Sequence, residues 1–250
     1  MATAPLFGRC KPHLLGQTVV VIGGSAGIGL ETARRARSEG ASLILAARDK
    51  NRLELAAQET GAKHIATFDA NDADALEAFF RNLPMLVDHV MVTAGAPHYR
   101  PPLEVSPEEG RKDLTEHLLL AINVARCAVG KLMPGGSLTF MGGTGARRPR
   151  QGLAIVSTVT VALPALIANL ALELAPARVN LIAAGFVDTQ LSASLLGDNL
   201  EKRREELRQI LPIRRVVEPA DVAALAVHIM SNKALTGATY DIDGGQQLVS

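Results

Sequence analysis

A regular alternation of short apolar runs and longer helix-forming segments constrains the fold of this chain more than any other feature. The first run, QTVVVIGG, is rich in β-branched residues and ends in glycines, and the helix-forming segment LETARRARSEGA follows it. The alternation continues to the last run, ATYDIDGG. Strands joined by helical crossovers form parallel sheets that are covered on both faces. We therefore expect a single doubly wound, Rossmann-type α/β domain over residues 1–250, with ligands at the carboxyl ends of the strands.

The charge balance and the cysteines limit the classes of partner. The chain has 26 Lys and Arg against 25 Asp and Glu, which gives no electrostatic reason to expect nucleic acid or an anionic membrane. Cys10 and Cys127 match neither a disulfide framework nor a zinc site, which predicts reduced thiols in a cytoplasmic protein and no bound metal. Because Pro164 and Asn169 interrupt the most apolar stretch, we expect no membrane-spanning helix.

A glycine turn lies between the first expected strand and the first expected helix. Gly23, Gly27 and Gly29 form a G-x-x-x-G-x-G pattern there. Glycines let the backbone approach a pyrophosphate, whose charge then lies against the free N–H groups of the helix N-terminus. Glycine turns also occur at such junctions for packing alone, and it is the position in the first βα unit that favours dinucleotide binding.

The end of the second expected strand indicates which dinucleotide is bound. Receptors for NAD usually place a carboxylate there, whereas this strand ends with Ala47 and Arg48. The Arg48 guanidinium is suited to bidentate hydrogen bonds with a 2′-phosphate. The alternative is a solvated arginine, since neither Ser25 nor Ala26 adds a second positive charge. We expect NADP(H) as the cofactor.

Further motifs follow in order along the chain: TAGA at 93–96, ELAPARVN, AAGFVDT and LTGATYDIDGG. Together with GGSAGIG they make the sequence resemble the short-chain dehydrogenase/reductase family over almost its whole length. The resemblance implies that Asp69 bonds the adenine amine, and that the Val187 backbone and the Thr189 hydroxyl hold the nicotinamide half. The cofactor-binding residues expected from the glycine turn, the second strand and this resemblance are Gly23, Ser25, Gly27, Ile28, Gly29, Arg48, Asp69, Ala70, Ala94, Gly95, Thr160, Val187 and Thr189.

The departures from the family pattern concern the proton-transfer residues. By the resemblance, Val156 and Thr160 stand where the family has its tyrosine and lysine, Gly143 replaces its serine, and His117 replaces its helix asparagine. Loss of a general acid costs a factor of about 10²–10⁴ in rate. Hydride transfer is nonetheless the chemistry of the cofactor. We therefore expect an oxidoreductase that acts on a more electrophilic small molecule, such as an iminium ion, a quinone or a conjugated alkene.

Three residues are candidates for the missing catalytic groups. His98 and Tyr99 follow TAGAP, in a loop that the resemblance places at the substrate end of the cleft, and Thr144 is adjacent to Gly143. A histidine titrates near neutral pH and tyrosine is the family's own acid. Alternative interpretations are an ordinary surface loop for His98 and Tyr99 and turn chemistry for Thr144. His117 more often makes a structural hydrogen bond than acts as an acid.

Two functions from different classes remain open at this point. One is an NADP(H)-dependent oxidoreductase with an atypical proton route, and the other is a dinucleotide-binding sensor or scaffold without turnover. Arg147, Arg148 and Arg150 either attract an anionic substrate or form a solvated basic loop. The segments EHLLLAINVARCAVGKL and TVTVALPALIANLALEL are apolar around much of their circumference, which predicts a homodimer or homotetramer.

Overall fold

The chain folds around one parallel β-sheet. The computed structural model describes residues 12–249 except residues 98, 100 and 149. The strands are β1 (Thr18–Ile22), β2 (Ser42–Ala47), β3 (His64–Thr67), β4 (Val87–Val92), β5 (Leu132–Gly143), β6 (Arg178–Ala184) and β7 (Thr239–Ile242). They lie in the order β3-β2-β1-β4-β5-β6-β7, and every neighbouring pair is parallel. The predicted doubly wound Rossmann-type fold is confirmed.

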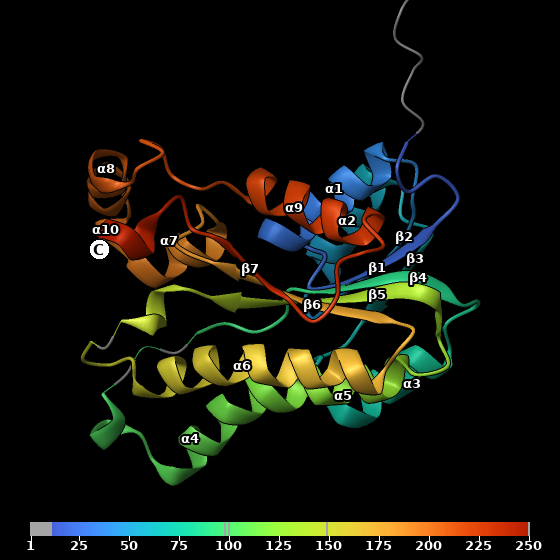
Figure 1. Ribbon diagram of the computed structural model, residues 1–250, viewed down its shortest axis with the longest axis horizontal. Helices are drawn as coiled ribbons and strands as arrows, with labels where there is room; N and C mark the ends of the chain where they lie inside the picture. The colour runs from blue at the N-terminus through green and yellow to red at the C-terminus, as the bar shows by residue number, and fades with distance from the viewer. Residues whose placement is uncertain (1–11, 98, 100, 149, 250) are drawn as a thin grey trace, which may run out of the picture.

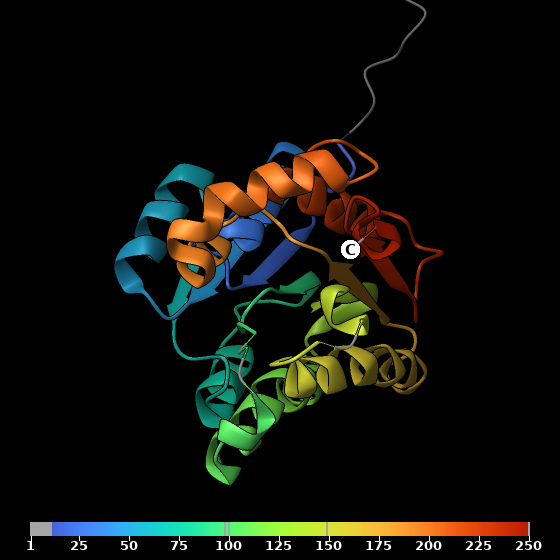
Figure 2. The same ribbon diagram turned by 90° about the vertical axis from the view of Figure 1, so that its left-hand side faces the viewer.

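Helices cover both faces of this sheet (Figure 1). The helices are α1 (Gly27–Ser38), α2 (Lys50–Thr60), α3 (Ala73–Arg81), α4 (Pro107–Leu114), α5 (Leu120–Ala128), α6 (Ala154–Glu173), α7 (Gln190–Leu196), α8 (Leu200–Ile210), α9 (Pro219–Ser231) and α10 (Gln246–Val249). Helices α1, α2 and α9 lie on one face, and α3, α5 and α6 lie on the other. Helices α7, α8 and α10 gather at one end, beyond the carboxyl ends of β6 and β7 (Figure 2).

Successive side chains of β1 point alternately into the two hydrophobic cores. Val19 and Val21 face the core beneath α1, α2 and α9. Val20 and Ile22 face the core beneath α3, α5 and α6. Side chains of a strand alternate between the two faces, and a strand buried on both faces therefore reads as a continuous apolar run. This is why VVVI signals an inner strand of the sheet.

Two helical regions are interrupted. The apolar segment EHLLLAINVARCAVGKL begins within a π-helical turn at Thr115–Leu119, and its helix α5 ends at Ala128, because β5 already begins at Leu132. Residues 190–210 form two helices, because Gly197, whose φ is 51°, ends α7 before α8 begins. The π-helical turn carries His117, and such turns are frequent at functional sites.

The expectation that no helix is long and apolar enough to cross a membrane was wrong for α6. This helix continues through Pro164 for 20 residues with a mean hydropathy of 2.0, which meets that criterion by length and composition alone. Val159, Leu163 and Ile167 of α6 are buried in the core against the sheet. Within the described residues α6 is therefore a core helix of the α/β fold.

Candidate functional site

The glycine turn is packed against the end of β4 through Thr93. The Thr93 hydroxyl donates to the carbonyl oxygen of Gly23 at 3.2 Å, and the Thr93 amide donates to Ile22 at 2.8 Å. A Cβ added at Gly29 would lie 2.2 Å from the Gly23 carbonyl oxygen, and one at Gly23 would lie 2.5 Å from the Thr93 hydroxyl. Larger residues are therefore excluded at both positions, and the turn brings the start of α1 to the sheet at its switch point.

The N-terminus of α1 has no capping side chain. The cap residue Ala26 makes no side-chain hydrogen bond, and the first turn contains no acidic residue. By contrast, Asp49 caps α2, Asp72 caps α3 and Ser106 caps α4. Free N–H groups at the positive end of a helix dipole favour an anion. Ser25, Gly27 and Ile28, which were expected to contact the cofactor, lie half-buried at this point.

A polar cavity of about 410 Å³ lies beyond the ends of β2 and β3. Arg48 lies 3.9 Å from Asp69 there, and the Asp69 carboxylate also accepts from the Asn71 amide at 3.0 Å. Two predicted cofactor residues therefore lie together. The cavity is lined by Arg48, Asp69, Asn71, Asp72, Arg111, Lys112, Thr115 and Glu116.

Sequence reasoning missed the contribution of α4 to this cavity. Arg111 and Lys112 come from α4, and Thr115 and Glu116 come from the π-helical turn that follows. Nothing in the local pattern of α4 indicates that it packs near the end of β2, since charged residues on a helix usually form a solvated face.

The other predicted cofactor residues of this region follow β3 and β4. Buried Ala70 follows Asp69, and Ala94 and Gly95 follow Thr93 at the end of β4.

The loop after β6, residues 185–189, approaches the glycine turn. We call it the β6 loop. A Cβ added at Gly27 would lie 3.6 Å from the Thr189 side chain, which brings Thr189 next to the start of α1. Thr189 caps α7 by accepting from the Ser192 amide at 3.1 Å, and the Ser192 hydroxyl donates to the Val187 carbonyl at 2.6 Å. Ser192, which sequence reasoning missed, therefore contacts both residues expected at the nicotinamide half.

The loop after β5, residues 144–148, carries Thr144 and is called the β5 loop. Thr144 is 1% exposed, and its hydroxyl has no hydrogen-bond partner among the described residues. Its amide donates to Ala184 at 2.9 Å, which extends the pairing of β5 with β6. Burial closes the Thr144 hydroxyl to solvent in the described state, which counts against its expected role as a catalytic group.

The residues at the family's tyrosine and lysine positions lie on α6, and the candidate Tyr99 lies in the loop after β4. Val156 and Thr160 are one helical turn apart on α6, Val156 half-buried and Thr160 7% exposed. Tyr99 is 54% exposed, and desolvation by nearby protein atoms raises the pKa of its phenol. His98 lies outside the described residues. The His117 ring donates through Nδ1 to the Asp113 carbonyl at 2.8 Å, which matches the structural role considered for it.

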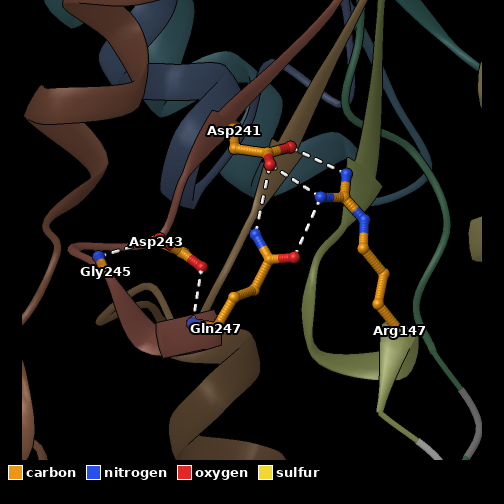
Figure 3. Close-up of polar contacts among 5 residues, drawn as sticks. All are labelled: Arg147, Asp241, Asp243, Gly245 and Gln247. Carbon is orange, nitrogen blue, oxygen red and sulfur yellow. Dashed lines mark hydrogen bonds and ion pairs between the residues drawn. The ribbon is translucent and has the colours of Figure 1, made fainter. Parts of the chain in front are cut away.

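The Arg147 side chain is 30% exposed and forms a two-bond ion pair with Asp241, so its charge is already paired within the protein (Figure 3). Among the described residues, no group of three or more His, Cys, Asp or Glu side chains is arranged to hold a metal ion. Cys10 lies outside the described residues, and Cys127 is a free thiol.

The sheet order, the glycine turn and the uncapped α1 define a Rossmann-type α/β domain with a turn suited to a dinucleotide. Residues 23–247 match the family described as enoyl-(acyl carrier protein) reductase. The chain belongs to the short-chain dehydrogenase/reductase family.

Known relatives resemble the chain over nearly its whole length. Dehydrogenase/reductase SDR family member 4 of Sus scrofa is 30% identical, and the match covers 95% of this chain and 89% of that protein. A short-chain dehydrogenase/reductase structure from Brucella melitensis has a TM-score of 0.84 and 26% identity, covering 94% of this chain and 98% of that one. A small-chain dehydrogenase in complex with NADPH has a TM-score of 0.79 and 26% identity, covering 93% and 99%.

Proposed function

We propose that the protein is an NADP(H)-dependent oxidoreductase that acts on an activated small molecule by an atypical proton route. One observation carries this proposal. The groups suited to a dinucleotide are kept around the glycine turn and Thr189, while α6 presents Val156 and Thr160 where the family resemblance expects tyrosine and lysine. Neither side chain can give a proton to a carbonyl oxygen in the way that a tyrosine does. The residues suited to binding a dinucleotide are present, and the tyrosine that serves as the acid in the family is absent.

The residues present are suited to NADPH. Gly23 and Gly29 let the turn pack tightly against the end of β4, and the first-turn N–H groups of α1 would hold the pyrophosphate. Arg48 would pair with the 2′-phosphate, and Val187 and Thr189 would hold the nicotinamide half. When bound, the cofactor supplies a hydride. The solved relative in complex with NADPH supports this choice by analogy.

The chemistry available to the chain determines the class of substrate. Because a missing general acid costs a factor of about 10²–10⁴, reduction of an unactivated ketone would be slow. Hydride addition to an iminium ion gives a neutral amine without a proton transfer. A quinone or a conjugated alkene delocalises the negative charge that develops when it accepts the hydride. His98, Tyr99 and Thr144 are the candidate proton donors or hydrogen-bond donors. Half-buried, apolar Val156 would lie against the substrate where the family places its acid.

A second function, a dinucleotide-binding sensor or scaffold without turnover, is favoured by two observations. The Thr144 hydroxyl is buried, and the pKa of Tyr99 is raised instead of lowered, which makes its phenol a weaker acid. Neither group is therefore tuned for proton donation in the described state. The sensor would bind NADPH and leave its redox state unchanged.

One experiment separates the two functions. The purified protein is incubated with NADPH and a panel of iminium ions, quinones and enones, and the absorbance of the reduced cofactor is followed. Oxidation that depends on both protein and substrate supports the oxidoreductase. Tight NADPH binding without oxidation on any member of the panel supports the sensor. Parallel reactions without substrate correct for slow oxidation by oxygen, and reactions with NADH report cofactor preference.

A further inference from the structure

The C-terminal segment turns back over the end of the sheet directly after β7. Asp243 accepts hydrogen bonds from the Gly245 amide at 2.8 Å and from the Gln247 amide at 3.0 Å (Figure 3). Gly244 and Gly245 have φ angles of 65° and 83°, which glycine adopts without strain. The Asp243 carboxylate thus holds the tight turn that leads into α10, and it fixes the position of Gln246 and Gln247.

The first contact of this segment is with the β5 loop. Arg147 donates to both carboxylate oxygens of Asp241, at 2.6 and 2.7 Å, and to the side-chain oxygen of Gln247 at 3.0 Å. The Gln247 side-chain amide donates to Asp241 at 3.1 Å, which closes a ring of three side chains (Figure 3). The Arg148 guanidinium also donates to the Gln247 carbonyl. The hydrogen bonds from Arg147 lower the pKa of Asp241, which keeps the carboxylate charged.

The second contact is with the β6 loop. The Gln246 side-chain oxygen accepts from the Phe186 amide at 2.9 Å. A Cβ added at Gly185 would lie 2.6 Å from Cβ of Asp243 and 2.7 Å from the Gln246 side-chain oxygen. The backbone of the β6 loop therefore lies directly against the C-terminal turn, and Gly185 is the residue that permits this approach.

Both contacts are next to residues of the candidate site. The Arg147 amide donates to the Thr144 carbonyl at 3.1 Å, so the ion pair is joined to the turn that carries Thr144. Phe186 immediately precedes Val187. The β5 and β6 loops are separate segments of the chain, and the C-terminal segment bonds to both through adjacent glutamines.

A solvated ion pair alone would contribute little, because exposed Arg–carboxylate pairs are screened by water. The ring here differs in two ways. The Arg147 and Asp241 side chains are only 30% and 40% exposed, and Gln247 bonds to both partners. Bidentate geometry restricts the guanidinium to one orientation. The ring is therefore suited to holding the β5 loop in one place.

We propose that Asp241, Gln246 and Gln247 form a C-terminal clamp that fixes the β5 and β6 loops relative to each other at the nicotinamide end of the site. In this role they are positioning residues, which act through the Thr144 turn and the Val187 backbone. The positioning role rests on the proposed function. The physical coupling of the two loops does not depend on it, and the two parts are tested separately.

Hydrogen exchange of the cofactor-free protein tests the coupling. We expect Asp241→Asn and Gln247→Leu each to raise amide exchange about tenfold in both loops, while β1 and β4 stay protected. Arg34→Gln is the matched control, because it removes a two-bond ion pair with Glu59 between α1 and α2, away from the clamp. If the variants raise exchange in the C-terminal segment alone, or in one loop alone, the clamp is refuted. The double variant Arg147→Asp with Asp241→Arg should restore protection.

Cofactor binding tests the positioning role. The chain has no tryptophan, so the emission of bound NADPH reports the nicotinamide environment directly. We expect Asp241→Asn to weaken NADPH binding about three- to tenfold and to shift its emission towards that of free NADPH. Binding of 2′,5′-ADP, which has no nicotinamide, should change less than twofold.

The outcomes are distinguishable. Equal losses of NADPH and 2′,5′-ADP binding would indicate general destabilisation and overturn the positioning role, and so would an unchanged emission spectrum in Asp241→Asn. If the parent protein binds no NADPH, the proposed function fails and the positioning role fails with it. The exchange measurement on the free protein still decides whether the clamp couples the loops.

Discussion

Arg204 of α8 donates a hydrogen bond to Asp188 over 2.6 Å, and Asp188 lies between Val187 and Thr189 in the β6 loop. Both side chains are about three-quarters buried, at 24% and 27% exposure. The ion pair therefore ties a helix with a mainly solvated face to the loop that we expect at the nicotinamide half.

We predict that Asp188→Asn releases α8 from this loop. NADPH should dissociate about two- to tenfold faster, because the loosened β6 loop would hold the nicotinamide half less firmly, and stopped-flow displacement measures this rate. Arg208→Gln is the matched control, since it removes an exposed pair with Glu205 on the same helix. An unchanged dissociation rate in Asp188→Asn would show that this ion pair does not control release.

Cofactor preference should depend on Arg48. We predict that the protein binds NADPH more tightly than NADH and that Arg48→Ala removes most of the difference, about 10- to 100-fold, because a charge-assisted hydrogen bond to the 2′-phosphate is lost. Calorimetric titration with both cofactors measures it. Arg52→Ala, in the first turn of α2, is the control, because it removes an exposed ion pair with Asp49. Equal affinities for NADPH and NADH in the parent protein would contradict the assignment.

Acid stability should depend on His89. This buried ring bonds to Ser137 at 2.8 Å and to Gln17 at 2.7 Å, and desolvation lowers its pKa to about 3. Between pH 6.5 and that value the unfolded chain binds a proton that the folded protein does not, so stability falls with falling pH by about 1.4 kcal/mol per pH unit. Above pH 6.5 the contribution vanishes, because the ring is neutral in both states.

Urea unfolding between pH 6.5 and 5 measures this slope of the unfolding free energy against pH. This range is used because it lies above the usual pKa values of carboxylates. His89→Gln should flatten it while lowering stability at neutral pH. His64→Gln, at an exposed position, is the control. A slope in His89→Gln as steep as in the parent protein would assign the acid sensitivity to other groups.

Self-association should use the outward face of α6. Val161 and Leu172 are 66% and 79% exposed and lie three helical turns apart on one side, although the helix as a whole is strongly apolar. We predict a homodimer or homotetramer in which this face is covered, and a lower mass for Leu172→Glu. Light scattering at micromolar concentration measures the mass, with Leu55→Glu on α2 as the control for an exposed leucine. A monomeric parent protein would refute the interface.

Proton donation is testable once the panel has given a substrate. We predict that Tyr99→Phe lowers turnover by a factor of about 10²–10⁴ with NADPH affinity nearly unchanged, if its phenol supplies the proton. Since its pKa is raised above the usual value of 10, this route should stay constant through neutral pH and decline only in strong alkali. His98→Phe is tested in parallel. Full turnover in both variants would leave water or the substrate as the proton source.

Local pattern was sufficient for the parts of this protein that depend on neighbours in the sequence. The continuous apolar run Val19–Ile22 predicted an inner parallel strand, because a strand buried on both faces has no polar alternation. The glycine pattern predicted a turn between the first strand and the first helix, and the structure has a tight turn there, with the carbonyl of Gly23 lying against Gly29. Arg48 was expected at the 2′-phosphate from the end of its strand and Asp69 at the adenine amine from the family resemblance, and the two side chains lie 3.9 Å apart.

Only the tertiary structure decided which distant side chains meet and which are buried. Arg147 bonds to Asp241, 94 residues away, although its sequence context is that of a solvated basic loop. Lys112 lines the polar cavity beyond β2 and β3, and Thr144 loses its contact with solvent, for the same reason. The periodic pattern of apolar residues in a sequence indicates which face of its own helix or strand a residue occupies. Ion pairs and burial depend on the packing of separate elements, which follows from the closure of the whole sheet and its two helical layers.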